Sequence, residues 1–87
     1  MLVAPLTEAQ LAAAEVDNGV LVIEVDDSGV AANAGIIKDD VLVAFGPKAI
    51  TTPAQFAELV SASESGDSVA VLVTRNKNPL FIALTMP

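Results

Sequence analysis

GVLVIEVDDSGVAANAGIIKDDVLVAF, residues 19–45, contains two short apolar runs with a segment of small residues between them. The runs, 20–25 and 41–45, are rich in Val and Ile and bounded by Asp and Gly, a pattern typical of β-strands. Between them, residues 30–34 (VAANA) predict a short helix that Ser28-Gly29 can cap and that Gly35 can end in the left-handed conformation. Because three of its five residues are Ala, this helix can lie close against the strands.

Residues 28–42, SGVAANAGIIKDDVL, resemble the signature of bacterial PDZ domains, especially those of the HtrA/Do (Deg) serine proteases. In that signature a strand is followed by GSPAAxAGLxxGDxI. The match is specific in the AAxAG core and in the pair Asp40-Val41, whereas Val30 replaces Pro and Asp39 replaces Gly. These two departures concern turn geometry. The resemblance covers residues 1–86, and the ending 75–84 is more similar to the second, C-terminal PDZ domain of such proteases than to the first.

Length and composition indicate one small domain, residues 1–87. A chain of this size buries about 60 to 65% of its unfolded surface. Apolar residues make up 53% of the chain and Phe is present three times, so we expect an aliphatic core. No apolar run approaches the roughly 18 residues that a membrane span needs, so we expect a soluble chain without membrane insertion, and any export signal lies outside it. The net charge of −7 disfavours binding to nucleic acid, and the absence of Cys fits either the cytoplasm or the periplasm.

The rest of the chain adds strands and two helices on either side of this stretch. Residues 1–4 predict an edge strand that Pro5 ends. A capping box at residues 7–10 opens a helix to about residue 14, and Thr52-Pro53 opens the main helix, which continues to about residue 63. Ala49-Ile50 predicts a brief strand, and the runs 69–73 and 80–86, joined by a turn at 75–79, predict a hairpin. The fold class is α+β: a small half-open antiparallel β-barrel of five to six strands with one main helix and one or two short ones, as the PDZ resemblance also implies.

Catalysis is tested first, because the resembled proteins are serine proteases. The chain has no His and no Cys, so it cannot supply a Ser-His-Asp triad or a Cys-His pair. A Ser-Lys dyad is formally possible, but Lys38, Lys48 and Lys77 lie in predicted turns with their long side chains toward water. We therefore expect no enzymatic activity in this chain, and we expect the parent protein to be a serine endopeptidase whose triad lies elsewhere.

The acidic pairs Asp26-Asp27 and Asp39-Asp40 lack the alternate spacing and final Glu of a calcium loop. Asp in a turn commonly accepts hydrogen bonds from nearby backbone amides. We expect Asp40 to fix its turn and the other three carboxylates to face solvent, with no metal site and no cofactor.

The PDZ resemblance implies a site where an extended peptide C-terminus adds as a strand between the edge strand and the main helix. Phe56 and Val60 are expected to face the core. The peptide-binding residues predicted in this way are Met1, Leu2, Val3, Ala4, Gln55, Leu59 and Ala62. Leu59 is equally consistent with the core. The resemblance implies that Met1 is the last hydrophobic residue of the loop that holds the peptide carboxylate, and that the Gly and first hydrophobic residue of this loop are missing from the chain. We therefore expect weak binding, with a dissociation constant of about tens of micromolar or poorer.

The resemblance thus implies a non-catalytic module that recognises C-terminal or unfolded polypeptide segments and regulates, or feeds substrate to, the protease domain of its parent in the periplasm or cell envelope. One alternative is a PDZ module of another envelope protein, such as a site-2 protease, a processing protease or a secretion component. Another is a structural docking domain without a free groove, in which the backbone amides of residues 2–4 are paired within the protein.

Overall fold

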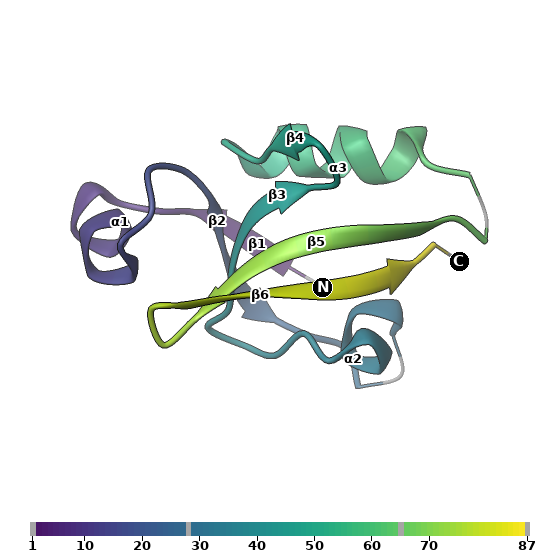
Figure 1. Ribbon diagram of the computed structural model, residues 1–87, viewed down its shortest axis with the longest axis horizontal. Coiled ribbons are helices and arrows are strands. Elements are labelled where there is room, and N and C mark those ends of the chain that lie inside the picture. Colours follow the sequence, from purple (N-terminus) through teal and green to yellow (C-terminus); the bar gives the residue numbers. More distant parts are fainter. Residues whose placement is uncertain (1, 28, 65, 87) are drawn as a thin grey trace.

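The computed structural model describes residues 2–27, 29–64 and 66–86, and within these residues one sheet of six strands carries three helices. Figure 1 shows α3 along the top of the sheet, α2 at its lower edge and α1 at the opposite end from both. The fold class expected from the sequence is confirmed. The elements, in chain order, are β1 (Leu2–Pro5), α1 (Glu8–Ala14), β2 (Val20–Glu24), α2 (Val30–Ala34), β3 (Val41–Phe45), β4 (Lys48–Ala49), α3 (Pro53–Ala62), β5 (Ser68–Arg75) and β6 (Asn78–Thr85).

The strands are ordered β1-β2-β3-β5-β6, with β4 beside β3, and every pairing is antiparallel. This order places β1 and β6 at the two ends of the sheet. Between β1 and β2 the register shifts, because Leu2 is opposite Glu24 while Val3 is opposite Val22. Ile23 is therefore an extra residue, and the bulge it makes increases the local twist of this edge.

Helix boundaries follow the side chains that cap them. The Thr7 hydroxyl accepts from the Gln10 backbone amide and the Gln10 side chain accepts from the Thr7 amide, which completes the expected capping box. At α3 the Thr52 hydroxyl accepts from the Gln55 amide and Pro53 is the first helical residue. Gly35 ends α2 with φ 100°, a value that glycine adopts without strain.

Aliphatic side chains make up most of the core. Val20, Val22, Leu42, Ile50 and Val71 have no measurable exposure. The rings of Phe45 in β3 and Phe56 in α3 meet edge to face, with centroids 6.1 Å apart and planes at 79°. This aromatic contact attaches α3 to the sheet, and Leu59 and Val60 of the same helix also pack against the core.

Two turns differ in detail from the sequence-based expectation. The β5–β6 connection is only Asn76-Lys77, both with positive φ (52° and 66°), so the strands extend further than expected and enclose a two-residue turn. β4 begins at Lys48, one residue earlier than predicted.

Asp39, where the PDZ signature has Gly, adopts φ 76°, so this chain keeps the left-handed turn with a less permissive residue.

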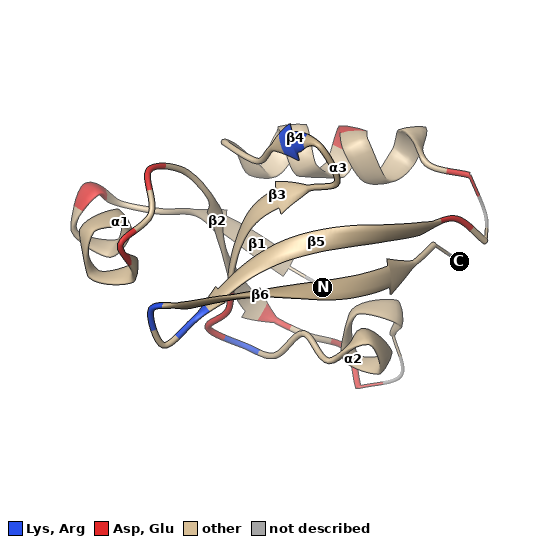
Figure 2. Ribbon diagram, viewed as in Figure 1, with Lys and Arg blue, Asp and Glu red and all other residues tan. Residues whose placement is uncertain are grey.

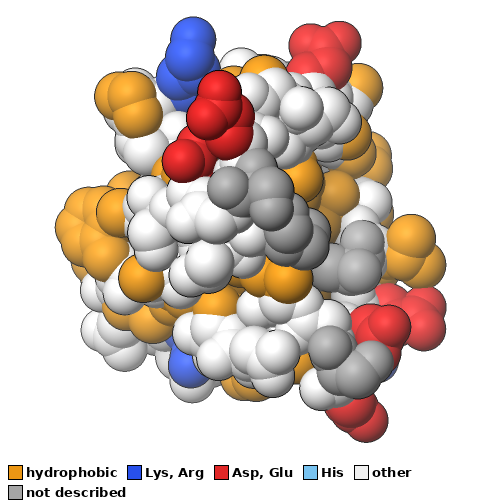
Figure 3. Space-filling view, turned by 90° about the vertical axis from the view of Figure 1, so that its right-hand side faces the viewer, with side chains coloured by type: hydrophobic (Ala, Val, Ile, Leu, Met, Phe, Trp, Pro, Cys, Tyr) orange, Lys and Arg blue, Asp and Glu red, His pale blue; other side chains and the backbone are white. Residues whose placement is uncertain are grey.

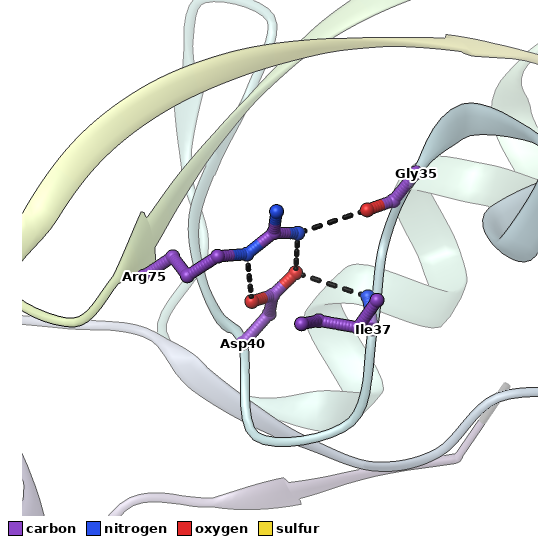
Figure 4. Close-up of polar contacts among 4 residues, drawn as sticks. All are labelled: Gly35, Ile37, Asp40 and Arg75. Atoms are coloured by element: carbon purple, nitrogen blue, oxygen red, sulfur yellow. Dashed lines mark hydrogen bonds and ion pairs between the residues drawn. The ribbon is translucent and has the colours of Figure 1, made fainter.

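An ion pair between the buried Asp40 and the partly exposed Arg75 joins the α2–β3 turn to β5 (Figure 4). Asp40 is 1% exposed, and its carboxylate accepts from Arg75 Nε at 2.8 Å and Nη2 at 2.6 Å. Asp40 also accepts from the Ile37 amide at 3.1 Å, and Arg75 Nη2 donates to the Gly35 carbonyl at 2.8 Å. The hydrogen bond from Asp40 raises the pKa of Arg75 above its usual value. The turn-fixing role expected for Asp40 is confirmed, and the other three acidic residues of the two pairs are exposed.

Replacing Asp40 by Asn should lower the free energy of unfolding by about 1.5 to 3 kcal/mol, because the partly exposed Arg75 would lose its counter-charge and one of the two Asp40 oxygens that accept from it. Urea unfolding followed by circular dichroism measures this change. Asp39→Asn is the matched control: Asp39 is exposed, and Asn tolerates positive φ, so a change below about 0.5 kcal/mol is expected. The pKa of Arg75 is raised in the folded state, so the stability that its positive charge contributes is present at neutral pH and is lost only when the pH rises into the alkaline range where Arg75 loses its proton. The loss of stability in Asp40→Asn should therefore be the same at about pH 6 and at about pH 8.

Candidate functional site

The edge strand β1 lies beside helix α3, which is the arrangement that the proposed binding mode requires. The strand order leaves β1 paired on one side, with β2, and α3 contacts β1 across the opening on its other side. In an antiparallel strand, alternate backbone N–H and C=O groups point away from the partner strand. The outer edge of β1 therefore offers backbone groups to an added strand, up to Pro5, which has no N–H to offer.

A groove of about 540 Å³ runs between β1 and α3. This volume lies within the range of about 300 to 1,000 Å³ that is usual for ligand pockets. Figure 3 looks at the end of the molecule toward which α2 and α3 extend, and it shows hydrophobic side chains exposed below the helix at the top. The groove is lined by residues from β1, the loop and helix of α2, the face of α3, and the end of β6: Leu2, Val3, Asp26, Gly29, Val30, Ala31, Pro53, Phe56, Ala57, Val60, Ser61, Leu84 and Met86.

The floor of the groove is also part of the protein core. Ala31, Phe56, Leu84 and Met86 line the groove and are each less than 9% exposed. An apolar ligand side chain placed here would extend the core, and its burial would contribute about 1.5 to 3 kcal/mol. Among the described lining residues Asp26 is the one charged side chain, so the groove itself holds no described cation.

Two of the four strand residues that the sequence predicted to bind peptide line the groove. Leu2 and Val3 line the groove, and Leu2 is 55% exposed although it is apolar. Ala4 is in β1 and half-buried, next to the lining residues but outside the lining itself. Met1 lies outside the described residues.

The helix half of the predicted site differs from the face that lines the groove. Phe56 is in the core as expected, but Val60 reaches both the core and the groove. Gln55 folds back over the helix start, where its Oε1 accepts from the Thr51 amide at 2.8 Å and hydroxyl at 2.6 Å. Leu59 packs against the core, and Ala62 is exposed and does not line the groove. These three residues therefore lie outside the groove lining, and Pro53, Ala57 and Ser61 are the residues of α3 that lie on the lining face together with Phe56 and Val60.

Sequence reasoning also missed the contribution of α2 and β6 to the groove. Val30 and Ala31 come from the small-residue helix, which packs mainly against β6, and Leu84 and Met86 come from the chain's last strand and the residue after it. The AAxAG pattern was a usable signal, because small side chains let α2 approach closely. Nothing in the local pattern of residues 80–86 places that strand beneath the groove.

Comparisons with known protein families, sequences and structures agree with the fold described above. The family model described as "PDZ domain" matches residues 9–86. The chain is 41% identical over 86 residues to a Halomonas elongata protein named "Probable periplasmic serine endoprotease DegP-like", and 40% identical over 81 residues to a Hahella chejuensis protein of the same name. These matches cover 99% and 93% of this chain but only 18% and 17% of the relatives, so the chain spans less than a fifth of their length.

Two solved structures share the fold. The PDZ domain of HtrA3 bound to a phage-derived ligand, FGRWV, superposes with a TM-score of 0.83 at 19% identity, covering 98% of this chain and 79% of that one. An HtrA-type protease, AlgW, with a decapeptide superposes with a TM-score of 0.90 at 20% identity, covering 97% of this chain and 26% of that one. At such low identity these two similarities concern the fold alone. The family match over residues 9–86 goes further: this chain belongs to the PDZ domain family, and its relatives in sequence are DegP-like serine endoproteases.

Proposed function

We propose that this chain is a peptide-recognition module that binds extended apolar C-terminal or unfolded segments by strand addition to β1. The observation that carries the proposal is the apolar groove between an edge strand and α3. Backbone hydrogen bonds to β1 supply sequence-independent affinity, and pockets for alternate side chains supply selectivity. The alternative of a docking domain without a groove needs β1 paired on both sides, whereas the strand order leaves it at the end of the sheet.

The relatives support both the ligand class and the setting. The HtrA3 PDZ structure contains a peptide ligand that ends in Trp-Val, and the AlgW structure contains a decapeptide. The curated relatives carry the words periplasmic and serine endoprotease in their names. We therefore infer that the parent of this domain is an HtrA-type serine endoprotease of the periplasm, and that the domain presents substrate to the protease domain or regulates it. This favours an HtrA-type parent over a site-2 protease or a secretion component.

Titration of this domain with a short peptide that ends in an aliphatic residue should shift the backbone amide resonances of Val3 and Ala4 together with those of Ala57, Val60 and Ser61. We expect a dissociation constant of about 10 to 100 µM, or roughly −7 to −5.5 kcal/mol, because one or two apolar side chains are buried at a solvent-open groove. Heteronuclear NMR at increasing peptide concentration measures both the affinity and the affected residues. Shifts confined to other surfaces, or no shift at millimolar peptide, would count against the proposal.

Ala57→Gln should weaken peptide binding at least about tenfold, because a long side chain would fill the groove where Ala57 lines it. Ala62→Gln is the matched control: it introduces the same side chain at another exposed alanine of α3 that does not line the groove. Both changes keep a good helix former, so the unfolding midpoint should stay within about 2 to 4 °C of the parent domain. A larger loss of affinity in Ala62→Gln than in Ala57→Gln would contradict this and would favour a site on the helix face of Gln55, Leu59 and Ala62.

A further inference from the structure

The side of the β5–β6 hairpin that faces away from the core is apolar and uncovered. Side chains alternate along each strand, so Val71 and Leu84 are buried in the core while their neighbours point to the other side of the sheet. On that side Ala70, Phe81 and Ala83 are exposed. In Figure 1 the hairpin crosses the front of the molecule, and none of the three described helices lies in front of it.

A row of cross-strand neighbours extends this surface over four strands. Ala49 in β4 is opposite Ala44 in β3. Ala44 is opposite Leu72 in β5, and Leu72 is opposite Phe81 in β6. Directly opposite side chains lie on the same side of a sheet. Phe81 is 74% exposed, more than any other described large apolar residue. We call this surface the outer sheet face; it is formed by Ala44, Ala49, Ala70, Leu72, Phe81 and Ala83.

The outer sheet face contains no charged residue, although the chain has a net charge of −7. Arg75 is the one charged residue in β5 and β6, and it binds the buried Asp40. Figure 2 shows both strands tan along most of their length, with charged residues in the turns at their ends. Copies of an acidic chain repel one another where their carboxylates approach. On this face two copies can meet without placing carboxylates against each other.

We infer that a second copy of this chain covers the outer sheet face, in a weak twofold dimer in which the two sheets pack face to face. A twofold interface joins the same surface of both copies, so that surface must complement itself. The cross-strand row has a large ring at one end and small side chains at the other. A twofold axis that runs along the strands between β3 and β5 places Phe81 of each copy over Ala49 of the other, and Leu72 over Ala44.

The size of the face sets the strength of the contact. A buried aromatic side chain covers about 150 to 250 Å², so Phe81, Leu72 and the alanines together amount to on the order of 400 Å² per copy. A stable interface buries about 800 Å² per partner. We therefore expect a dissociation constant of about 0.1 to 1 mM. The peptide groove stays open in such a dimer, because Leu84 lines the groove from the other side of β6.

Sedimentation equilibrium and NMR of the domain at about 20 µM to 2 mM, a range that brackets the expected dissociation constant, test this inference. The amide resonances of Leu72, Phe81 and Ala83 should shift with concentration, and those of Val3 and Ala57 in the groove should not. Raising the salt from about 10 mM to about 0.1 M shortens the screening length from about 30 to about 10 Å. The dimer should then become at least about twofold tighter, because repulsion between two acidic copies is screened.

Phe81→Thr should weaken the dimer at least about tenfold, because it removes the largest side chain of the face and keeps a residue that favours strands. Ile23→Thr is the matched control. Ile23 is an apolar residue of β2 that is 42% exposed and lies outside the outer sheet face. Its replacement should change the dissociation constant by less than about twofold, since an apolar residue outside the interface adds little to binding.

A second pair of variants adds one carboxylate to the chain at two exposed alanines. Ala83→Glu places it within the outer sheet face, and Ala62→Glu places it at the end of α3. Both variants have the same net charge, so the general repulsion between copies is equal. The dimer should be lost in Ala83→Glu and retained in Ala62→Glu, because a charge buried in an apolar interface has no partner. Circular dichroism verifies that both variants are folded.

A domain that is monomeric at every concentration and at both salt concentrations would overturn this inference and leave the face to a different partner. Concentration-dependent shifts centred on the groove, a weaker dimer at the higher salt concentration, or equal losses in each variant and its control would also overturn it. Peptide titrations on dilute, monomeric domain are independent of all these outcomes, so the proposed peptide-binding function is tested separately.

Discussion

The pairing of Asp40 with Arg75 is the constraint on which the site depends. Asp40 is buried, and the guanidinium that it binds also donates to the carbonyl of Gly35, the residue that ends α2. One side chain from β5 thus holds both the start of β3 and the end of the short helix. Because α2 supplies Val30 and Ala31 to the groove, this polar contact positions one end of the groove. A five-residue helix is too short to be stable by itself, so its place must come from such tertiary contacts.

The groove is a part of the hydrophobic core that the fold leaves open. Phe56, Leu84 and Met86 are buried, yet they form its floor, so the same side chains stabilise the domain and line the proposed binding groove. A domain of this size has a small free energy of unfolding, so its fold depends on a compact aliphatic core and one aromatic contact. A ligand in the groove would cover apolar surface that folding leaves accessible, such as that of Leu2, and it would stabilise the domain by mass action.

Electrostatics and packing have separate roles in this molecule. The ion pair between Asp40 and Arg75 is structural and lies away from the groove lining, whereas the other described acidic residues are exposed. An excess of surface carboxylates does not specify the fold, but it does bias which ligands approach. Apolar burial and surface charge are therefore two separate contributions to the proposed binding at this groove. These two contributions respond differently to salt, so they can be measured separately.

The sequence alone determined the local elements, because the short apolar runs rich in Val and Ile, the caps at Thr7 and Thr52 and the glycine after α2 are properties of neighbouring residues. It also indicated the family, through the AAxAG core and Asp40. The tertiary structure decided which face of α3 meets β1. Helical periodicity shows that Phe56 and Val60 share a side, but the rotation of the helix depends on how its side chains pack against the core, where Phe56 meets Phe45, eleven residues earlier in the chain. The partner of Asp40 was equally inaccessible to sequence reasoning, because Arg75 is 35 positions away and only the pairing of β3 with β5 brings the two together.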